Sequence, residues 1–285
     1  MSSQDATPSS RARYDVARDL AAACPAACGS EIALTGSASR GVADGDSDIE
    51  VNFWSESLPS DEERDDWLRE VGAIEIVHDT EAIADGSIWS ACQYQGLRIE
   101  AGWQTVAAQQ RLLTAILEGA ILDHDRLIIA EVVRHAVPLR TGGILASWQT
   151  QLAEYPEVLR RRLIATAVKQ WHSAPFLWAL AARHEHVALT SRLLRHVEIL
   201  LRLLFALNRE WEPDWKWARY GARGLAIVPD RFQDRSDAVF FAPTPEERIA
   251  ALLELIADAL RLLPGTDDVV QARRAIGVSI DHRTP

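Results

Sequence analysis

The sequence predicts an α+β protein in which a mixed sheet with helices is followed by an all-α helical bundle. Three observations support this fold class. Residues 47–53 alternate polar and apolar side chains, which is the two-residue period of a strand with one buried face. Residues 88–94 and 96–103 have the composition of two further strands joined by a tight turn. From residue 127 onward the apolar residues recur at helical spacing instead.

The order of these patterns also predicts how the chain divides. At 285 residues, with 48% hydrophobic residues, the chain is long enough for two hydrophobic cores. We expect a disordered N-terminus over residues 1–13, a sheet-containing domain over residues 14–130 and a helical domain over residues 131–285.

The elements of the first domain can be predicted in order. Residues 15–23 have helical spacing and should pack beneath a short buried strand at residues 32–35. An acidic helix is expected over residues 61–70, because Ser60 occupies the N-cap position of a capping box. A strand over residues 73–78 then leads to the strand pair already described.

The turn after the first strand has the features of a phosphate-binding site. Residues 37–41 can form one helical turn directly after Gly36. Such a turn directs free backbone N–H groups and the hydroxyl of Ser37 toward an anion. We therefore expect a phosphate-binding turn at Gly36 and Ser37.

The alternation that follows predicts a metal site. It places Asp48, Glu50 and Asn52 on one face of the strand. Two neighbouring carboxylates repel each other, so without a partner they would destabilise the strand. Mg²⁺ or Mn²⁺ removes this repulsion, and such ions bind a few carboxylates together with water and substrate phosphates. The sequence thus predicts a divalent metal ion beside the phosphate-binding turn.

With these residues the chain resembles the nucleotidyltransferases of the DNA polymerase beta superfamily. Their signature is Gly-Ser followed about ten residues later by Asp-hydrophobic-Asp/Glu. The matching residues are Gly36, Ser37, Arg40, Gly41, Ser47, Asp48, Ile49 and Glu50. Glu50 is the one departure, because aspartate is commoner at that position.

The resemblance implies that residues 14–130 form a nucleotidyltransferase palm. It also implies that a nucleoside triphosphate is bound by Gly36, Ser37, Arg40 and Ser47, and that Asp48 and Glu50 are metal ligands. The alternative is a Gly-Ser turn before an edge strand whose acidic side chains are solvated.

The superfamily resemblance further implies a third carboxylate on a later strand. Glu100, between Ile99 and Ala101 in the strand at residues 96–103, matches it. Its role would be that of a metal ligand or of the base that takes the proton of the attacking hydroxyl, and the sequence leaves both open. The alternative is an exposed strand acid.

The helical domain contains one more resemblance. Residues 207–217 are similar to a segment, Leu-Asn-x-x-aromatic-x-Pro-x-x-Lys-Trp, of the helical C-terminal domains of kanamycin-type and related small-molecule nucleotidyltransferases. This implies that Lys216 faces the nucleotide phosphates. The alternative is an aromatic loop whose lysine extends into solvent. Later, a capping box at Thr244 begins another helix.

Charge and composition limit the partners. Residues 1–130 hold 9 Arg and no Lys against 23 acidic residues, a net charge of −14, and the remaining residues hold 21 basic against 18 acidic, a net charge of +3. This argues against a partner such as duplex nucleic acid, which needs clustered Lys and Arg. No apolar run is long enough for a bilayer and no apolar signal segment begins the chain, so we expect a cytoplasmic protein without a membrane partner.

The cysteines suggest neither a disulfide nor a zinc site. Cys24, Cys28 and Cys92 cannot all pair with one another, and no Cys/His set has the spacing of metal ligands. We expect buried or idle thiols.

Together these patterns predict an enzyme that moves a nucleoside monophosphate, expected to be AMP from ATP, to a hydroxyl of a small molecule and releases pyrophosphate. An aminoglycoside-type antibiotic is a suitable acceptor, because the acidic first domain would attract a cation. Two alternatives are a protein AMP-transferase of the minimal-nucleotidyltransferase antitoxin kind and a non-catalytic nucleotide-binding module. The acceptor, the preferred base and the oligomeric state stay open.

Overall fold

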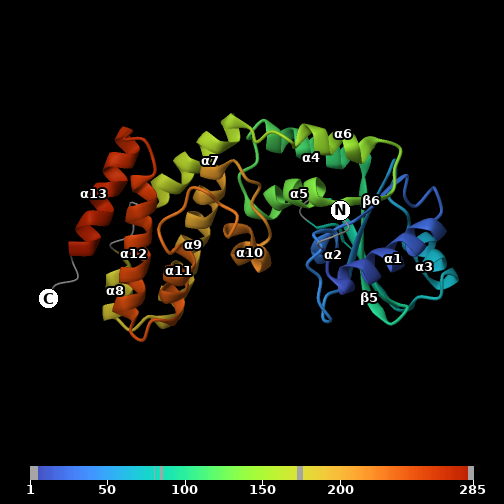
Figure 1. The fold of residues 1–285 in the computed structure, drawn as a ribbon, viewed down its shortest axis with the longest axis horizontal. Coiled ribbons are helices and arrows are strands. Elements are labelled where there is room, and N and C mark those ends of the chain that lie inside the picture. The colour runs from blue at the N-terminus through green and yellow to red at the C-terminus, as the bar shows by residue number, and fades with distance from the viewer. Residues whose placement is uncertain (1–5, 80, 84–85, 172–175, 282–285) are drawn as a thin grey trace. The chain divides into compact units, whose positions relative to one another are not determined.

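The computed structural model describes residues 6–79, 81–83, 86–171 and 176–281 and confirms the α+β fold class (Figure 1). The chain divides into two compact units, residues 1–154 and 155–285. The first contains a six-stranded mixed sheet with helices, and the second is helical. Among the described residues, no helix has the length and hydrophobicity that crossing a membrane requires.

The elements of the first unit are α1 (Pro8–Ala23), β1 (Glu31–Leu34), α2 (Gly36–Ser39), β2 (Ile49–Ser55), α3 (Asp61–Glu70), β3 (Ile74–His78), β4 (Ile88–Tyr94), β5 (Leu97–Thr105), α4 (Val106–Leu117), α5 (His124–His135), β6 (Val137–Arg140) and α6 (Ile144–Gln151). The strand order is β3-β4-β5-β2-β1-β6. Strands β2 and β5 are parallel, whereas the other neighbouring pairs are antiparallel. Strand β2 therefore lies inside the sheet, so the alternative of an edge strand is wrong.

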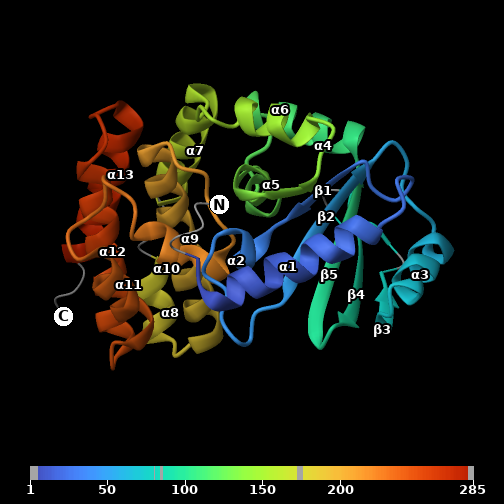
Figure 2. The same cartoon turned by 45° about the vertical axis from the view of Figure 1, so that its right-hand side comes forward.

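The core of this unit follows the predicted alternation of β2. Ile49, Val51 and Phe53 are fully buried, whereas Glu50 and Asn52 between them are partly exposed. The ring of Phe53 stacks on that of Trp103 from β5, with 4.9 Å between the ring centroids. Helix α1 packs against β1, β2 and β6 (Figure 2). Burying each large apolar side chain contributes roughly 1.5–3 kcal/mol, which fixes β2 in the centre of the sheet.

Helix α1 begins within the stretch that was expected to be disordered. Thr7 is its N-cap and accepts a hydrogen bond from the backbone N–H of Ser10 at 3.1 Å, and Pro8 follows in the first turn. The side chain of Arg13 is buried and donates to the backbone of the loop before β2. The first turns of α1 are therefore anchored, while residues 1–5 lie outside the described residues.

The first unit also extends beyond the boundary expected after residue 130. Strand β6 pairs with β1, which places Pro138 opposite Ala33. The buried carboxylate of Glu31 on β1 accepts hydrogen bonds from the N–H groups of Ile144 and Leu145 at the start of α6. Helices α5 and α6 have helical periodicity, but these contacts make them part of the sheet-containing unit.

The elements of the second unit are α7 (Glu157–Gln170), α8 (Phe176–Ala182), α9 (His186–Asn208), the 3₁₀ helix η2 (Trp215–Trp217), α10 (Ala218–Ala222), α11 (Phe232–Phe241), α12 (Pro245–Arg261) and α13 (Asp267–Asp281). Helices α9 and α12 contribute most of the buried apolar residues of its core. The capping boxes predicted at Ser60 and Thr244 are both present.

The three cysteines are free and buried, which confirms the expectation of buried thiols. Burial raises the pKa of Cys24 to about 12 and that of Cys92 to about 11. Thiols with such pKa values stay protonated at neutral pH and are poor nucleophiles.

Candidate active site

The Gly-Ser turn after β1 contacts the carboxylate of Glu50. Gly36 has a φ of +65°, which favours glycine. A Cβ atom at this position would lie only 2.6 Å from Cδ of Glu50 and 2.7 Å from its Oε1. The N–H of Thr35 donates to the carbonyl of Glu50 at 2.9 Å and fixes the two segments together. The turn and the acidic strand face are therefore immediate neighbours.

Ser37 has the hydrogen-bonding capacity that a phosphate site needs. It is 6% exposed, and within the described part of the chain its hydroxyl has no hydrogen-bond partner. Residues 36–39 form α2, and the first N–H groups of a helix have no intrahelical acceptor. The hydroxyl and these N–H groups can together bind an anion.

The carboxylates of Glu50 and Glu100 lie on the same face of the sheet. The register of the parallel strands β2 and β5 places the two residues directly opposite each other, and both are partly exposed. Asp48 stands two residues before Glu50, just before β2 begins. The apolar neighbours Ile49 and Ile99 are fully buried, so the acidic face is oriented by the core beneath it.

Glu100 has a protein partner. Its Oε1 accepts hydrogen bonds from Nη2 of Arg98 at 2.8 Å and from Nε at 3.2 Å. The side chain of Arg98 is 60% exposed, and an ion pair as exposed as this one contributes little to stability. The pair can therefore open when a ligand approaches.

The structure does not gather the three acids into a finished metal cage. Within the described ranges, no group of three or more His, Cys, Asp or Glu side chains has the arrangement to hold a metal ion. Mg²⁺ does not require such a cage, because it often binds one or two carboxylates and completes its shell with water and substrate phosphates. Glu50 beside the Gly-Ser turn and Asp48 two residues before it supply oxygen donors suited to this type of site.

Arg40 has a different environment from the one expected of a phosphate ligand. Its Nη1 donates to the carbonyl of Gly36 at 2.6 Å, its Nε donates to Glu131 at 3.1 Å, and its Nη2 forms an ion pair with the same carboxylate. Both side chains of the pair are 9% exposed. Arg40 thus holds the turn in place from inside the unit, and Glu131 of α5 orients it.

Ser47 organises the loop that leads into Asp48. Its hydroxyl donates to the carboxylate of Asp44 at 2.8 Å and accepts from the N–H of Asp44 at 3.0 Å. The first of these hydrogen bonds is the largest cause of the lowered pKa of Asp44. The carbonyl of Ser47 accepts from Nε of the buried Arg13 at 2.8 Å. Ser47 therefore positions Asp48 through the backbone.

Sequence reasoning missed three residues of this arrangement. Glu131 and Arg13 reach the motif from other helices, and no local pattern identifies them. Thr35 donates its hydroxyl to Oδ1 of Asn52 at 3.0 Å, which ties the turn to β2. Its position directly before Gly36 is the one signal that could have drawn attention to it.

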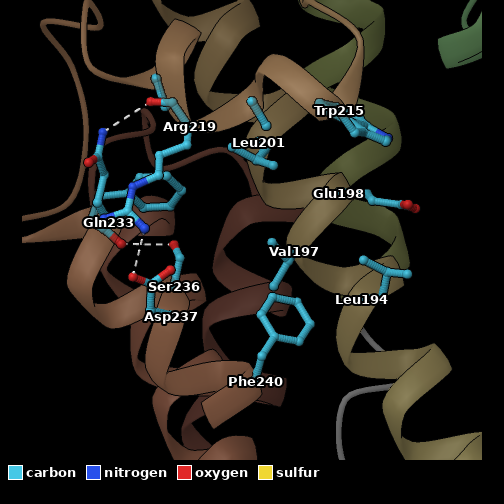
Figure 3. Close-up of a pocket in the computed structure, with 13 residues that line it drawn as sticks. Leu194, Val197, Glu198, Leu201, Trp215, Arg219, Gln233, Ser236, Asp237 and Phe240 are labelled. Carbon is cyan, nitrogen blue, oxygen red and sulfur yellow. Dashed lines mark hydrogen bonds and ion pairs between the residues drawn. The ribbon is translucent and has the colours of Figure 1, made fainter. Parts of the chain in front are cut away.

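Lys216 lies in the second unit, in η2, and is exposed. Asp214 is the N-cap of η2, and its side chain accepts a hydrogen bond from the backbone N–H of Lys216 at 2.9 Å. Its neighbour Trp215 lines a cavity of about 460 Å³ between α9, α10 and α11 (Figure 3). The wall is mainly apolar, with an ion pair of 3.0 Å between Arg219 and Asp237 on one side. The aromatic segment thus borders a cavity, while the side chain of Lys216 is exposed.

Comparison with known proteins adds three findings. A family model described as a domain of unknown function (DUF4037) matches residues 121–218. Among solved structures, the chain is similar to a nucleotidyltransferase-like protein from Exiguobacterium sibiricum 255-15, with a TM-score of 0.41, 12% identity and coverage of 96% of this chain and 77% of that chain. No curated protein sequence matches. Since likeness at this level supports no functional conclusion, function has to be argued from the residues.

Proposed function

We propose that this protein is a divalent-metal-dependent nucleotidyltransferase. It would move a nucleoside monophosphate, AMP in the first instance, from a triphosphate to a hydroxyl of a small molecule and release pyrophosphate. The observation that carries the proposal is the contact between Gly36 and the carboxylate of Glu50. It joins a turn suited to phosphate with an acidic strand face suited to a divalent cation.

The chain's own residues would bind and orient the triphosphate. The hydroxyl of Ser37 and the N–H groups of α2 would donate to its terminal phosphates, while Arg40 holds the carbonyl of Gly36 so that the turn keeps its shape. Lys216, in the second unit, is a candidate phosphate ligand only through the resemblance of its segment. Ser47 would keep Asp48 in position.

Asp48 and Glu50 would hold the metal ion, because they are oxygen donors beside the phosphate-binding turn. When bound, such an ion neutralises the charge that develops on the phosphoryl oxygens. Glu100, opposite Glu50, would take the proton of the attacking hydroxyl or complete the metal site, and its Oε2 is available for either role while Arg98 binds Oε1. The hydroxyl oxygen forms a bond to the α-phosphorus as the bond to the pyrophosphate oxygen breaks.

The acceptor we propose is a cationic, polyhydroxylated molecule of the aminoglycoside kind. The net charge of −14 over residues 1–130 favours association with a cation. No contact in the structure selects a particular acceptor, so a panel is required.

The test is incubation with each of the four ribonucleoside triphosphates, Mg²⁺ and a panel of aminoglycosides and neutral polyols. Mass spectrometry would then detect a nucleotidyl adduct on the acceptor. We expect an adduct with at least one cationic acceptor, and none with the Asp48→Asn variant. An adduct on a protein instead would favour the protein AMP-transferase. Triphosphate binding without any adduct would favour the non-catalytic module.

A further inference from the structure

The second unit contains a basic cavity of about 550 Å³ between α7, α8 and α9. Lys169, Arg192 and Arg195 line it, and no carboxylate does among the described residues. His196 belongs to the same wall, and Phe176 and Ile199 are among its apolar residues. We call it the basic cavity.

Helix geometry explains why these groups converge. On α9, Arg192, Arg195, His196 and Ile199 follow the i, i+3, i+4, i+7 spacing of one helix face. Lys169 stands in the last turn of α7, which packs against α9. Two helices therefore direct cations toward a single concavity.

Within the residues that the structure describes, no acceptor or carboxylate is bonded to Lys169, Arg192 or Arg195. Residues 131–285 hold 18 acidic against 21 basic residues, so carboxylates are present in this part of the chain. Other arginines of this unit do pair with carboxylates, among them Arg160, Arg209, Arg219 and Arg235. Three unpaired like charges around one cavity repel each other, and a bound anion would relieve this repulsion.

His196 provides a second, independent observation. Its side chain is 6% exposed, and its Nδ1 is buried with no hydrogen-bond partner. Burial, together with the charges of Arg192 and Arg195, lowers the pKa of His196 to about 4. The ring is therefore neutral at physiological pH. A buried polar atom without a partner costs free energy, so the neutral ring of His196 is held in the wall of the basic cavity at a cost to stability.

We propose that the basic cavity binds a small organic phosphate. Its phosphate group would be held by Lys169, Arg192 and Arg195, since the guanidinium fork matches phosphate geometry. Its organic body would lie against Phe176, which is 49% exposed, and Ile199. The volume falls within the range of small-molecule sites, and the acidic chain as a whole disfavours nucleic acid.

Pyridoxal 5′-phosphate is a direct probe, because it is an aromatic phosphate whose aldehyde condenses with a lysine amine and releases water. Borohydride then reduces the imine to a stable adduct. The sequence holds two lysines, Lys169 and Lys216, and both are exposed, so Lys216 is an internal reference. At limiting probe, with EDTA and without nucleotide, peptide mass spectrometry should show Lys169 modified at least about tenfold faster than Lys216. This factor corresponds to 1.4 kcal/mol.

The control variants separate a site from general lysine reactivity. Arg192→Gln/Arg195→Gln should remove the preference for Lys169, and pyridoxal, which lacks the phosphate, should show none. Arg183→Gln/Arg223→Gln removes two exposed arginines that do not line the cavity and should keep the preference. Equal modification of both lysines, or a preference unchanged by the first double variant, would overturn the proposal.

Competition identifies the ligand class. 1-Naphthyl phosphate should protect Lys169 at a concentration at least about tenfold below that of inorganic phosphate. Equal protection would refute the role of the apolar wall, and stronger protection by a single-stranded oligonucleotide would refute a small-molecule site. None of these measurements requires nucleotidyl transfer, so a failure of the proposed function would leave this result interpretable.

Discussion

Replacing Gly36 with alanine tests the contact on which the proposed active site depends. The added Cβ would lie 2.6 Å from Cδ of Glu50, whereas ordinary van der Waals contact begins at 3.4 Å. The carboxyl group must therefore move away by at least 0.8 Å, the difference between these two distances. The carboxyl group is the end of a flexible side chain and can move. The substitution should therefore disturb the geometry of the site more than the stability of the fold.

Gly96→Ala provides the matched control. Gly96 also has a positive φ, +76°, but a Cβ added there would have no atom within 4 Å, so the variant carries the backbone strain without the contact. Each substitution should lower the free energy of unfolding by about 1–2 kcal/mol, the cost of a left-handed conformation. Chemical denaturation measures this quantity for both variants.

The two variants should then differ in nucleotidyl transfer. A displacement near 1 Å at a reacting centre can cost about 100-fold in rate. We expect Gly36→Ala to slow transfer by about that factor and Gly96→Ala to remain within a few-fold of the parent in single-turnover assays. Similar rates for the two variants, at similar stability, would refute the functional importance of the contact between Gly36 and Glu50.

Four further predictions follow from the same contacts. Glu100→Gln should leave triphosphate affinity nearly normal but slow single-turnover transfer at least about 100-fold. The control variant Arg98→Gln should retain activity. A Glu100→Gln variant with an unchanged transfer rate would show that Glu100 is an ordinary strand acid. Calorimetry should detect triphosphate binding with Mg²⁺ and much weaker binding in EDTA, and equal affinities would contradict a metal-bridged site. Glu131→Gln leaves Arg40 buried without a counter-charge and should lower the free energy of unfolding by about 3 kcal/mol. Urea denaturation measures this quantity. A loss below about 1 kcal/mol would show that the fold does not depend on the pair. The pKa of His196 is lower in the folded state than in the unfolded state, so the unfolded chain binds the proton first as pH falls. Up to about 3 kcal/mol of the free energy of unfolding should therefore be lost between pH 6.5 and pH 4. His196→Leu should lack this part of the pH dependence, and an unchanged profile would contradict a neutral buried ring.

Local patterns predicted the parts of the site that depend on neighbouring residues. The period of residues 47–53 was sufficient to orient Glu50 toward the open face, because alternation along a strand is fixed by backbone geometry. The register that sets Glu50 opposite Glu100 depends on pairing between two strands separated by a helix and two further strands. No local signal encodes such pairing.

The beginning of α1 shows a different kind of limit. Thr7 and Pro8 are recognisable helix-start signals, but they lie within the stretch that was expected to be disordered. What stabilises these turns is long-range contact, since Ser10 accepts a hydrogen bond from the N–H of Ala43 and Arg13 binds the carbonyl of Ser47. Polar side chains that anchor a loop cannot be distinguished from solvated ones by composition.

The Arg40–Glu131 pair explains why the sheet-containing unit cannot end at residue 130. The two residues are 91 positions apart, yet Arg40 also holds the carbonyl of Gly36, so the Gly-Ser turn is supported by α5. A chain ending at residue 130 would leave a buried guanidinium without its counter-charge, which costs several kcal/mol. It would also remove β6 and expose the edge of β1 directly before the turn. The segment whose periodicity suggested the helical bundle is therefore the one that gives the Gly-Ser turn its shape.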